Sequence, residues 1–306
     1  MSANRIQHWI PQFYLRYFAV PGFRSKKNAK IWAMDANTGD VRKEKVHSVA
    51  STEFLYSHDK RDGTRCYRVE NELAELETII ARLYPRIAEG YPDLSAAWGI
   101  KKFAALFIIT LMLRHPQMEN ETREMHRRML DIYERVPKNT QGRPQVSHIF
   151  QNGKAFELDT SDYEEYKAAD ENRLKQMFAE QIRPLAVNLT DLLFRKRWAF
   201  LCTDAPVFFT SDKPVAKVHP DRRAFGIGTP GVHLYFPVAP TRMLWMSDRN
   251  GDESDGFYPL PVSEAAVLNM FTMANASTLL LSHEQPDRAL REVDIYMTQM
   301  RRAFVA

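Results

Sequence analysis

The feature that most constrains the fold is the 11-residue apolar run FAALFIITLML at residues 103–113. A helix needs roughly 20 predominantly apolar residues to cross a bilayer, so this run is too short for that role. A helix that is apolar on nearly all sides must instead be surrounded by protein. We therefore predict that a helix over about residues 95–114 is the buried centre of a helical part, and we expect no membrane partner.

A second helix is predicted over residues 69–89, followed in the chain by further amphipathic segments. Its apolar residues recur at alternating spacings of four and three, which places them along one helical face: Val69, Leu73, Leu76, Ile80, Leu83 and Ile87. Pro85 would stop or kink this helix near its end. We expect an amphipathic helix over 117–136, a loop over 137–145, and a polar helix over 161–195 that Pro184 breaks.

Strand patterns occupy the two ends of the chain. Alternating apolar residues around the Asn-Thr-Gly turn near residue 38 predict a β-hairpin. From Trp198 onward, short β-rich runs are separated by Pro, Gly and Asp, and helices are expected over 261–277, with Ser263 as N-cap, and over 287–303. The fold class is therefore α+β, with a helical middle packed on an antiparallel sheet contributed by the N- and C-terminal parts. We expect one domain over 1–306, with layers at 1–65, 66–195 and 196–306.

Composition excludes several classes of protein. Forty-two basic against 38 acidic residues, a formal charge of +4, is too small an excess for a surface covered in nucleic-acid contacts, although a local basic patch stays open. Cys66 and Cys202 are far apart and form no CxxC pair, which favours a reducing, cytoplasmic location. No basic stretch followed by an apolar one opens the chain, so we expect no signal peptide. The motifs GxGxxG, GxxxxGK[ST], GxSxG and HExxH are all missing.

The first candidate site is the opening stretch QHWIPQFYLRYF, which is rich in both apolar and polar side chains. His8, Gln12 and Arg16 are spaced four apart and would share a face if a helix ran through them, although Pro11 limits any helix to starting near it. In the functional interpretation, His8 is a base or metal ligand in a cleft, and Gln12 and Arg16 orient an anion. In the structural interpretation, His8 bonds a loop carbonyl and merely holds the N-terminal segment.

The second candidate is FFTSDKPV at residues 208–215. Asp212 follows a strand, where a side chain can point into a pocket, and Ser211 and Thr210 could hold its carboxylate. The structural alternative is an Asx-turn between two strands, which is common for Ser-Asp sequences.

The third candidate combines carboxylates with an arginine. Glu70 and Glu77 are two helical turns apart on one face, beside the apolar stripe, and could bind a divalent cation, which prefers oxygen ligands. Alternatively, they are surface charges that balance nearby arginines. Arg114 ends the apolar run, where the helix dipole favours a cation. If its neighbours draw it inward, it must find a carboxylate or a substrate anion, because an unpaired buried charge is costly.

Taken together and in order, these motifs resemble a bacterial domain-of-unknown-function family. The family is marked by a His-x-x-Pro-x-x-Tyr-Leu-x-x-Phe opening, here His8 to Phe18, and a Thr-Ser-Asp-x-Pro-Val motif, here Thr210 to Val215. Leu111 and His115 stand where the family often carries glutamine and threonine. The resemblance implies a shared architecture, no established activity, and a recurring polar set: His8, Gln12, Glu53, Glu70, Glu77, Arg114, Ser211, Asp212 and Asn269.

The leading hypothesis is a metal-dependent hydrolase of a phosphodiester or phosphorylated substrate, such as a nuclease of a bacterial conflict or defence system. Glu70, Glu77 and Asp212 would bind Mg²⁺ or Mn²⁺, His8 would act as the base close to Asp212, and Arg114 with Arg16 would neutralise the phosphate. Gln12, Ser211 and Asn269 would contact substrate. The alternatives are a non-catalytic protein that binds a ligand or partner in the same pocket, and a structural fold whose motifs only close the sheet.

Overall fold

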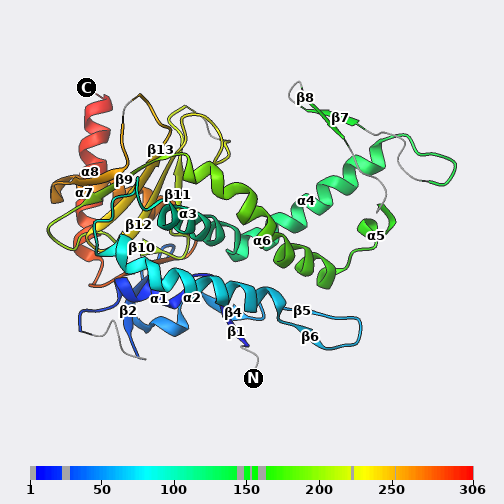
Figure 1. Ribbon diagram of the computed structural model, residues 1–306, viewed down its shortest axis with the longest axis horizontal. Coiled ribbons are helices and arrows are strands. Elements are labelled where there is room, and N and C mark those ends of the chain that lie inside the picture. Colours follow the sequence, from blue (N-terminus) through cyan, green and yellow to red (C-terminus); the bar gives the residue numbers. More distant parts are fainter. Residues whose placement is uncertain are drawn as a thin grey trace.

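The computed structural model has the predicted α+β architecture, with a helical middle and antiparallel pairing between strands from both ends of the chain. It describes residues 5–22, 28–142, 148–151, 154–157, 163–221, 224–251 and 253–305. Figure 1 shows α3 near the centre, the sheets and α8 at one end, and α4, α5 and the β7–β8 hairpin as an arm at the other. Within the described residues, no helix is both long enough and apolar enough to cross a membrane.

A four-stranded sheet joins the two ends of the chain in the order β10-β15-β2-β3, and all of its pairs are antiparallel. The predicted hairpin forms β2 (Lys30–Asp35) and β3 (Val41–Lys45), and β10 (Thr210–Ser211) and β15 (Leu279–Ser282) complete the sheet. In the hairpin turn, the Asp35 carboxylate accepts hydrogen bonds from the backbone N–H groups of Asn37 and Thr38, and Gly39 takes a φ of 79°. Glycine is favoured at such a left-handed position because it lacks a Cβ.

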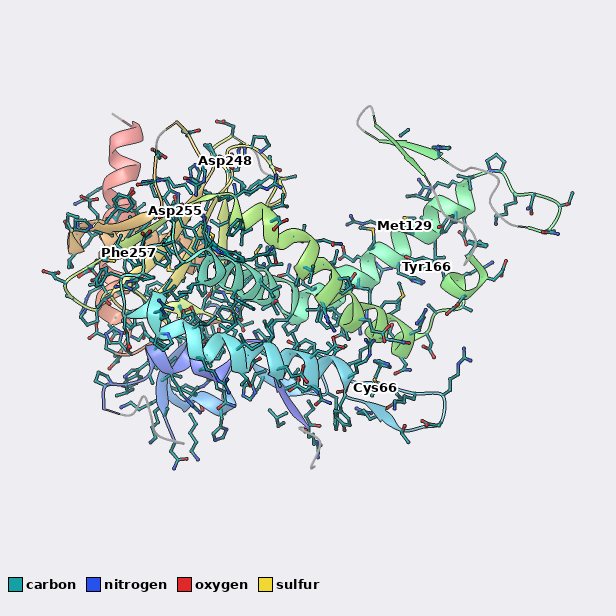
Figure 2. All side chains as sticks on the ribbon, viewed as in Figure 1. Cys66, Met129, Tyr166, Asp248, Asp255 and Phe257 are labelled. Carbon is teal, nitrogen blue, oxygen red and sulfur yellow. The ribbon has the colours of Figure 1, made fainter. Side chains whose placement is uncertain are left out.

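The five-stranded sheet has the order β11-β12-β13-β9-β14 and lies within the C-terminal part. Its strands are β9 (Arg197–Cys202), β11 (Ala216–Val218), β12 (His233–Ala239), β13 (Arg242–Ser247) and β14 (Gly256–Pro259). β14 pairs with β9 in parallel, so this sheet is mixed rather than purely antiparallel. Asp255, labelled in Figure 2, lies just before β14. It pairs with the buried Lys101 of the apolar helix at 2.7 Å, which ties the helical part to this sheet.

The apolar run lies in α3 (Trp98–Leu113), and its side chains are largely buried, as predicted. Beside it run α2 (Arg68–Ala88) and α6 (Glu171–Phe194). Pro85 and Pro184 lie inside these helices without ending them. For Pro184, the buried neighbours Ile182 and Ala186 continue the packed face on both sides, and tertiary packing outweighs one missing backbone hydrogen bond.

The opening stretch is both strand and helix. β1 (Ile6–His8) pairs with β4 (Ser51–Glu53), and after Pro11 the chain forms α1 (Gln12–Leu15) and the 3-10 turn η1 (Arg16–Phe18). His8 therefore does not share a helix with Gln12 and Arg16. Tyr14, Leu15 and Phe18 are fully buried, and the Tyr14 hydroxyl bonds Thr210 at 2.6 Å and a carbonyl of β12 at 2.8 Å. The stretch is apolar because it is core.

The arm carries a small cluster of its own. α4 (Pro116–Arg135) leads to β7 (His148–Gln151), β8 (Lys154–Glu157) and α5 (Tyr163–Lys167). Met129 and Tyr166 lie there, away from both sheets (Figure 2), and pack with the aromatic pair Tyr133 and Tyr163. The predicted helix over 161–195 is thus two helices, α5 and α6, and residues 143–147 of the expected loop lie outside the described residues.

The remaining elements are short hairpins and C-terminal helices. η2 (Val46–Ser48) precedes β4, and β5 (His58–Asp59) pairs with β6 (Arg65–Cys66). η3 (Val262–Glu264) leads into α7 (Ala265–Asn275), and α8 (Asp287–Val305) is the last helix. The prediction of Ser263 as the N-cap is wrong, because Ser263 lies within η3 and Glu264 precedes α7.

Candidate functional site

An open pocket of about 340 Å³ lies where β1 and α1 meet α2 and the end of α3. Five of the polar residues singled out in the sequence line it: His8, Gln12, Glu70, Glu77 and Arg114. The other lining residues are Phe13, Ala74, Thr78 and Ala81. The fold thus brings together side chains that are up to 106 residues apart in the chain.

One face of α2 forms the wall that carries the carboxylates. Glu70, Ala74, Glu77, Thr78 and Ala81 follow helical spacing and all line the pocket. The two alanines are small and leave room in front of the backbone. The Thr78 hydroxyl donates to the Ala74 carbonyl at 2.9 Å, so it is already used within the helix. The two glutamates are therefore the ionisable groups of this wall.

Arg114 is buried, with 2% of its surface exposed, and it forms an ion pair with the carboxylate of Glu77. Its Nη1 donates to Glu77 Oε1 at 2.7 Å, Nε to the Tyr56 hydroxyl at 3.3 Å, and Nη2 to the His8 carbonyl. Burial alone lowers the pKa of Arg114, but Tyr56 and Glu77 more than offset this and raise it. The arginine is therefore a charged tie between α3, α2 and β1, and Glu77 balances its charge.

The His8 ring is oriented by a backbone carbonyl. Its Nε2 lies 2.9 Å from the carbonyl oxygen of His47, which can only accept a hydrogen bond, so Nε2 carries the proton. In the neutral ring, Nδ1 then holds a free lone pair. Burial lowers the pKa of His8, and Arg114 adds to this, while the His47 carbonyl and Glu77 oppose it. At neutral pH the ring is uncharged and able to accept a proton.

Glu70 has an environment of the opposite kind. Its Oε2 is buried and has no hydrogen-bond partner. Burial, together with the neighbouring charge of Glu77, raises the pKa of Glu70 to about 7, against the opposing effect of Arg114. A carboxyl group with this pKa is partly protonated at neutral pH and can donate a proton.

The predicted place of Asp212 in this pocket is wrong. Its carboxylate is buried and accepts hydrogen bonds from the backbone N–H groups of Ser277 and Thr278, each at 2.8 Å, and from the Thr278 hydroxyl at 2.7 Å. These bonds hold the turn after β10 against the start of β15. Asp212 therefore has a structural role, but it does not form the predicted Asx-turn, because its partners lie next to β15 and not in its own turn. It is not among the residues that line the pocket.

Four further polar residues of the sequence prediction also lie outside the pocket lining. Ser211 is buried and accepts a bond from a backbone N–H two residues on, and Asn269, on α7, donates to a backbone carbonyl at 2.9 Å. Arg16 begins η1. Glu53 pairs with Arg5 at 2.7 Å on the surface. The pocket therefore draws its polar groups from the N-terminal and helical parts alone.

The predicted metal site lacks its third carboxylate. With Asp212 elsewhere, Glu70 and Glu77 are the two remaining proposed ligands for Mg²⁺ or Mn²⁺. Over the described part of the chain, no group of three or more His, Cys, Asp or Glu side chains is placed to hold a metal ion. Of the three proposed metal ligands, the pocket therefore brings together Glu70 and Glu77.

Sequence reasoning missed two residues that position this site. The Tyr56 hydroxyl contacts both the side chain and the backbone of Arg114, because it accepts a hydrogen bond from Nε and donates one to the carbonyl at 2.8 Å. The His47 carbonyl orients His8. A backbone carbonyl leaves no side-chain signal in a sequence. In the sequence, Tyr56 is one residue of the mixed stretch STEFLYS, and the available signal is that a tyrosine that becomes buried needs a hydrogen-bond partner for its hydroxyl.

Comparisons with known proteins place the chain in one family without assigning an activity. The family model described as "Protein of unknown function (DUF4238)" matches residues 6–286. No match to the chain was found among curated proteins or among solved structures.

Proposed function

Since that match covers nearly the whole chain, the protein belongs to the DUF4238 family, and we propose that it is a hydrolase of a phosphodiester or phosphorylated substrate. His8 and Glu70 are its acid–base pair. The observation that supports this proposal is that both groups line one open pocket and that their pKa values are shifted in opposite directions. The lowered pKa of His8 favours the neutral base, and the raised pKa of Glu70 favours the protonated acid. Titratable groups of one site whose pKa values are shifted in opposite directions are the pattern of general acid–base catalysis.

The chemistry assigns each group a proton. His8 Nδ1 takes the proton of the attacking hydroxyl as its oxygen bonds to phosphorus, and Glu70 donates a proton to the leaving oxygen as its bond to phosphorus breaks. Arg114 supports this arrangement by holding the His8 backbone and Glu77 in place. RNA is the most suitable phosphodiester, because its own 2′-hydroxyl is the nucleophile and no metal-activated water is needed. This first step leaves a 2′,3′-cyclic phosphate and a 5′-hydroxyl. In the second step water opens the cyclic phosphate, with Glu70 accepting the proton of water and His8 returning its proton to the 2′-oxygen, which completes the hydrolysis and restores both groups.

The metal-dependent form of this reaction is the second candidate, and one observation favours it. Glu70 Oε2 is buried without a partner, and Glu77 lies on the same face of α2. A divalent cation held by these carboxylates and water would supply positive charge to an anionic substrate. The pocket otherwise offers little positive charge, because Glu77 balances Arg114.

The test is cleavage of RNA, DNA and a generic phosphodiester, each with EDTA and with Mn²⁺. We expect RNA cleavage in EDTA, with kcat/KM lowered about 100-fold or more in His8→Ala and in Glu70→Gln. The matched controls are Glu75→Gln, at an exposed position on the same helix, and His148→Ala, at an exposed position on β7.

Three outcomes separate the alternatives. Cleavage that needs Mn²⁺ supports the metal-dependent candidate. Equal activity in the His8 and Glu70 variants and their controls removes the pocket from the reaction. Thermal stabilisation by an oligonucleotide without turnover overturns the hydrolase and supports a binding protein.

A further inference from the structure

A second pocket, of about 300 Å³, lies where the turn after β10 meets α3, α4 and α6, and it shares no residue with the first. Most of its lining is apolar: Ile109, Leu111, Met112, Leu113, Met118, Leu189, Pro214, Val215 and Ile227. The polar lining residues are Glu121, Lys213, Lys217 and Asn275. An apolar cavity with a few polar groups, at the small end of roughly 300–1,000 Å³, is typical of a site for a small molecule.

The two lysines at this pocket have neutral hydrogen-bond partners. Lys213 Nζ donates to the Gln117 side-chain oxygen at 3.0 Å, and Lys217 Nζ donates to the Phe225 carbonyl at 2.9 Å. Neither forms an ion pair with a described residue. Each ammonium group has three N–H donors, so both keep donors for a ligand. Burial and the charge of Lys213 lower the pKa of Lys217, against the opposing effect of Glu121, so an anion between the two lysines would relieve their repulsion.

The turn that carries Lys213 is held rigidly from two sides. The Asn275 side chain donates to the Lys213 carbonyl at 2.6 Å and to the Val215 carbonyl at 3.0 Å. The Asp212 carboxylate is bonded to the start of β15, and the Trp9 indole donates to the Asp212 carbonyl at 3.0 Å. A rigid turn lowers the entropy cost of binding because little has to be ordered. Asp212 thus has no part in the first pocket, but it holds the turn that carries Lys213 at the second one.

We propose that this pocket binds a small amphipathic anion, a medium-chain carboxylate. The carboxylate head lies between Lys213 and Lys217, and the alkyl chain packs on Met112, Leu113 and Leu189. The proposal does not depend on the hydrolase activity, because the two pockets share no lining residue.

The experiment is titration calorimetry of the full chain with octanoate, alongside octan-1-ol and octylammonium, which keep the chain and change the head. The variant is Lys213→Gln with Lys217→Gln. Its matched control is Lys60→Gln with Lys138→Gln, which removes the same charge at two exposed lysines outside the pocket lining.

We expect octanoate to bind at least tenfold more tightly than octan-1-ol, and octylammonium not to bind. The Lys213/Lys217 variant should bind octanoate at least tenfold more weakly, while the control variant binds it unchanged. Octanoate should also shift the ¹³C-methyl NMR signals of Met112 and Met118 in the unsubstituted protein, a readout that does not depend on how a variant folds. No octanoate binding, equal affinity for the alcohol, or unmoved Met112 and Met118 signals would overturn the proposal.

Discussion

The buried Glu70 carboxyl predicts a pH-dependent gain in stability for Glu70→Gln. Glutamine has the shape of protonated glutamate and cannot ionise. The pKa of Glu70 is raised from 4.5 to about 7 in the folded state. The folded chain therefore holds a proton that the unfolded chain has released, and the associated stability is fully present below pH 4.5 and lost as pH rises through about 7.

The size of the effect follows from that difference in pKa. Between 4.5 and about 7, at ~1.36 kcal/mol per pH unit, the upper value is ~3 kcal/mol. The side chain is only half-buried, and water near it screens part of this penalty. We expect Glu70→Gln to add about 2 kcal/mol more to the free energy of unfolding at pH 8 than it does at pH 5.

Urea unfolding followed by tryptophan fluorescence at pH 5 and pH 8 measures this difference directly. Glu75→Gln is the matched control, because Glu75 is exposed on the same helix, and its effect should be the same at both pH values. A Glu70→Gln effect that is equal at both pH values, or smaller at pH 8, would refute the reasoning. It would mean that the carboxylate has a stabilising partner in solution.

Three further predictions follow from the same contacts. The kcat/KM of the proposed hydrolysis should be bell-shaped in pH, rising as His8 loses its proton below pH 6.5 and falling as Glu70 loses its proton near pH 7. Glu70→Gln should abolish the fall on the alkaline side. A profile that is flat between pH 5 and 8 would contradict the assignment. Glu77→Gln leaves the Arg114 charge buried without a carboxylate and should lower the free energy of unfolding by about 3 kcal/mol, so a loss under about 0.5 kcal/mol in urea unfolding would show that water reaches the guanidinium. Asp212→Ala leaves two backbone N–H groups unpaired and should cost about 3 kcal/mol in the same assay, with kcat/KM unchanged within about twofold, since a catalytic Asp212 would lower it by about 100-fold or more.

Several elements of the site follow from local sequence alone. Helical periodicity places Glu70 and Glu77 on one face of α2, two turns apart, whatever the rest of the chain does. The apolar run makes α3 a buried helix, and Arg114 at its end then needs a carboxylate or a substrate anion, of which the structure shows the carboxylate of Glu77. These inferences needed only spacing and the cost of burying a charge.

The prediction failed where a contact joins segments that are distant in sequence. Asp212 was expected beside His8, but its carboxylate bonds Ser277 and Thr278, 65 and 66 residues further on. Nothing in a Thr-Ser-Asp sequence states which N–H groups its aspartate will meet. The same holds for the parallel pairing of β14 with β9, since strand partners are chosen by packing over the whole sheet.

By itself, the sequence determined the elements and their buried faces: a central apolar helix, an amphipathic helix with two carboxylates on one face, and strands at both ends of the chain. Those properties depend on residue spacing and on the cost of exposing apolar surface, which act within a few residues of each other. Only the tertiary structure decided that His8 and Glu70 line one pocket while Asp212 holds a turn elsewhere. Such contacts depend on long-range packing, because the assembled fold decides which backbone and charged groups lie within hydrogen-bonding distance of one another.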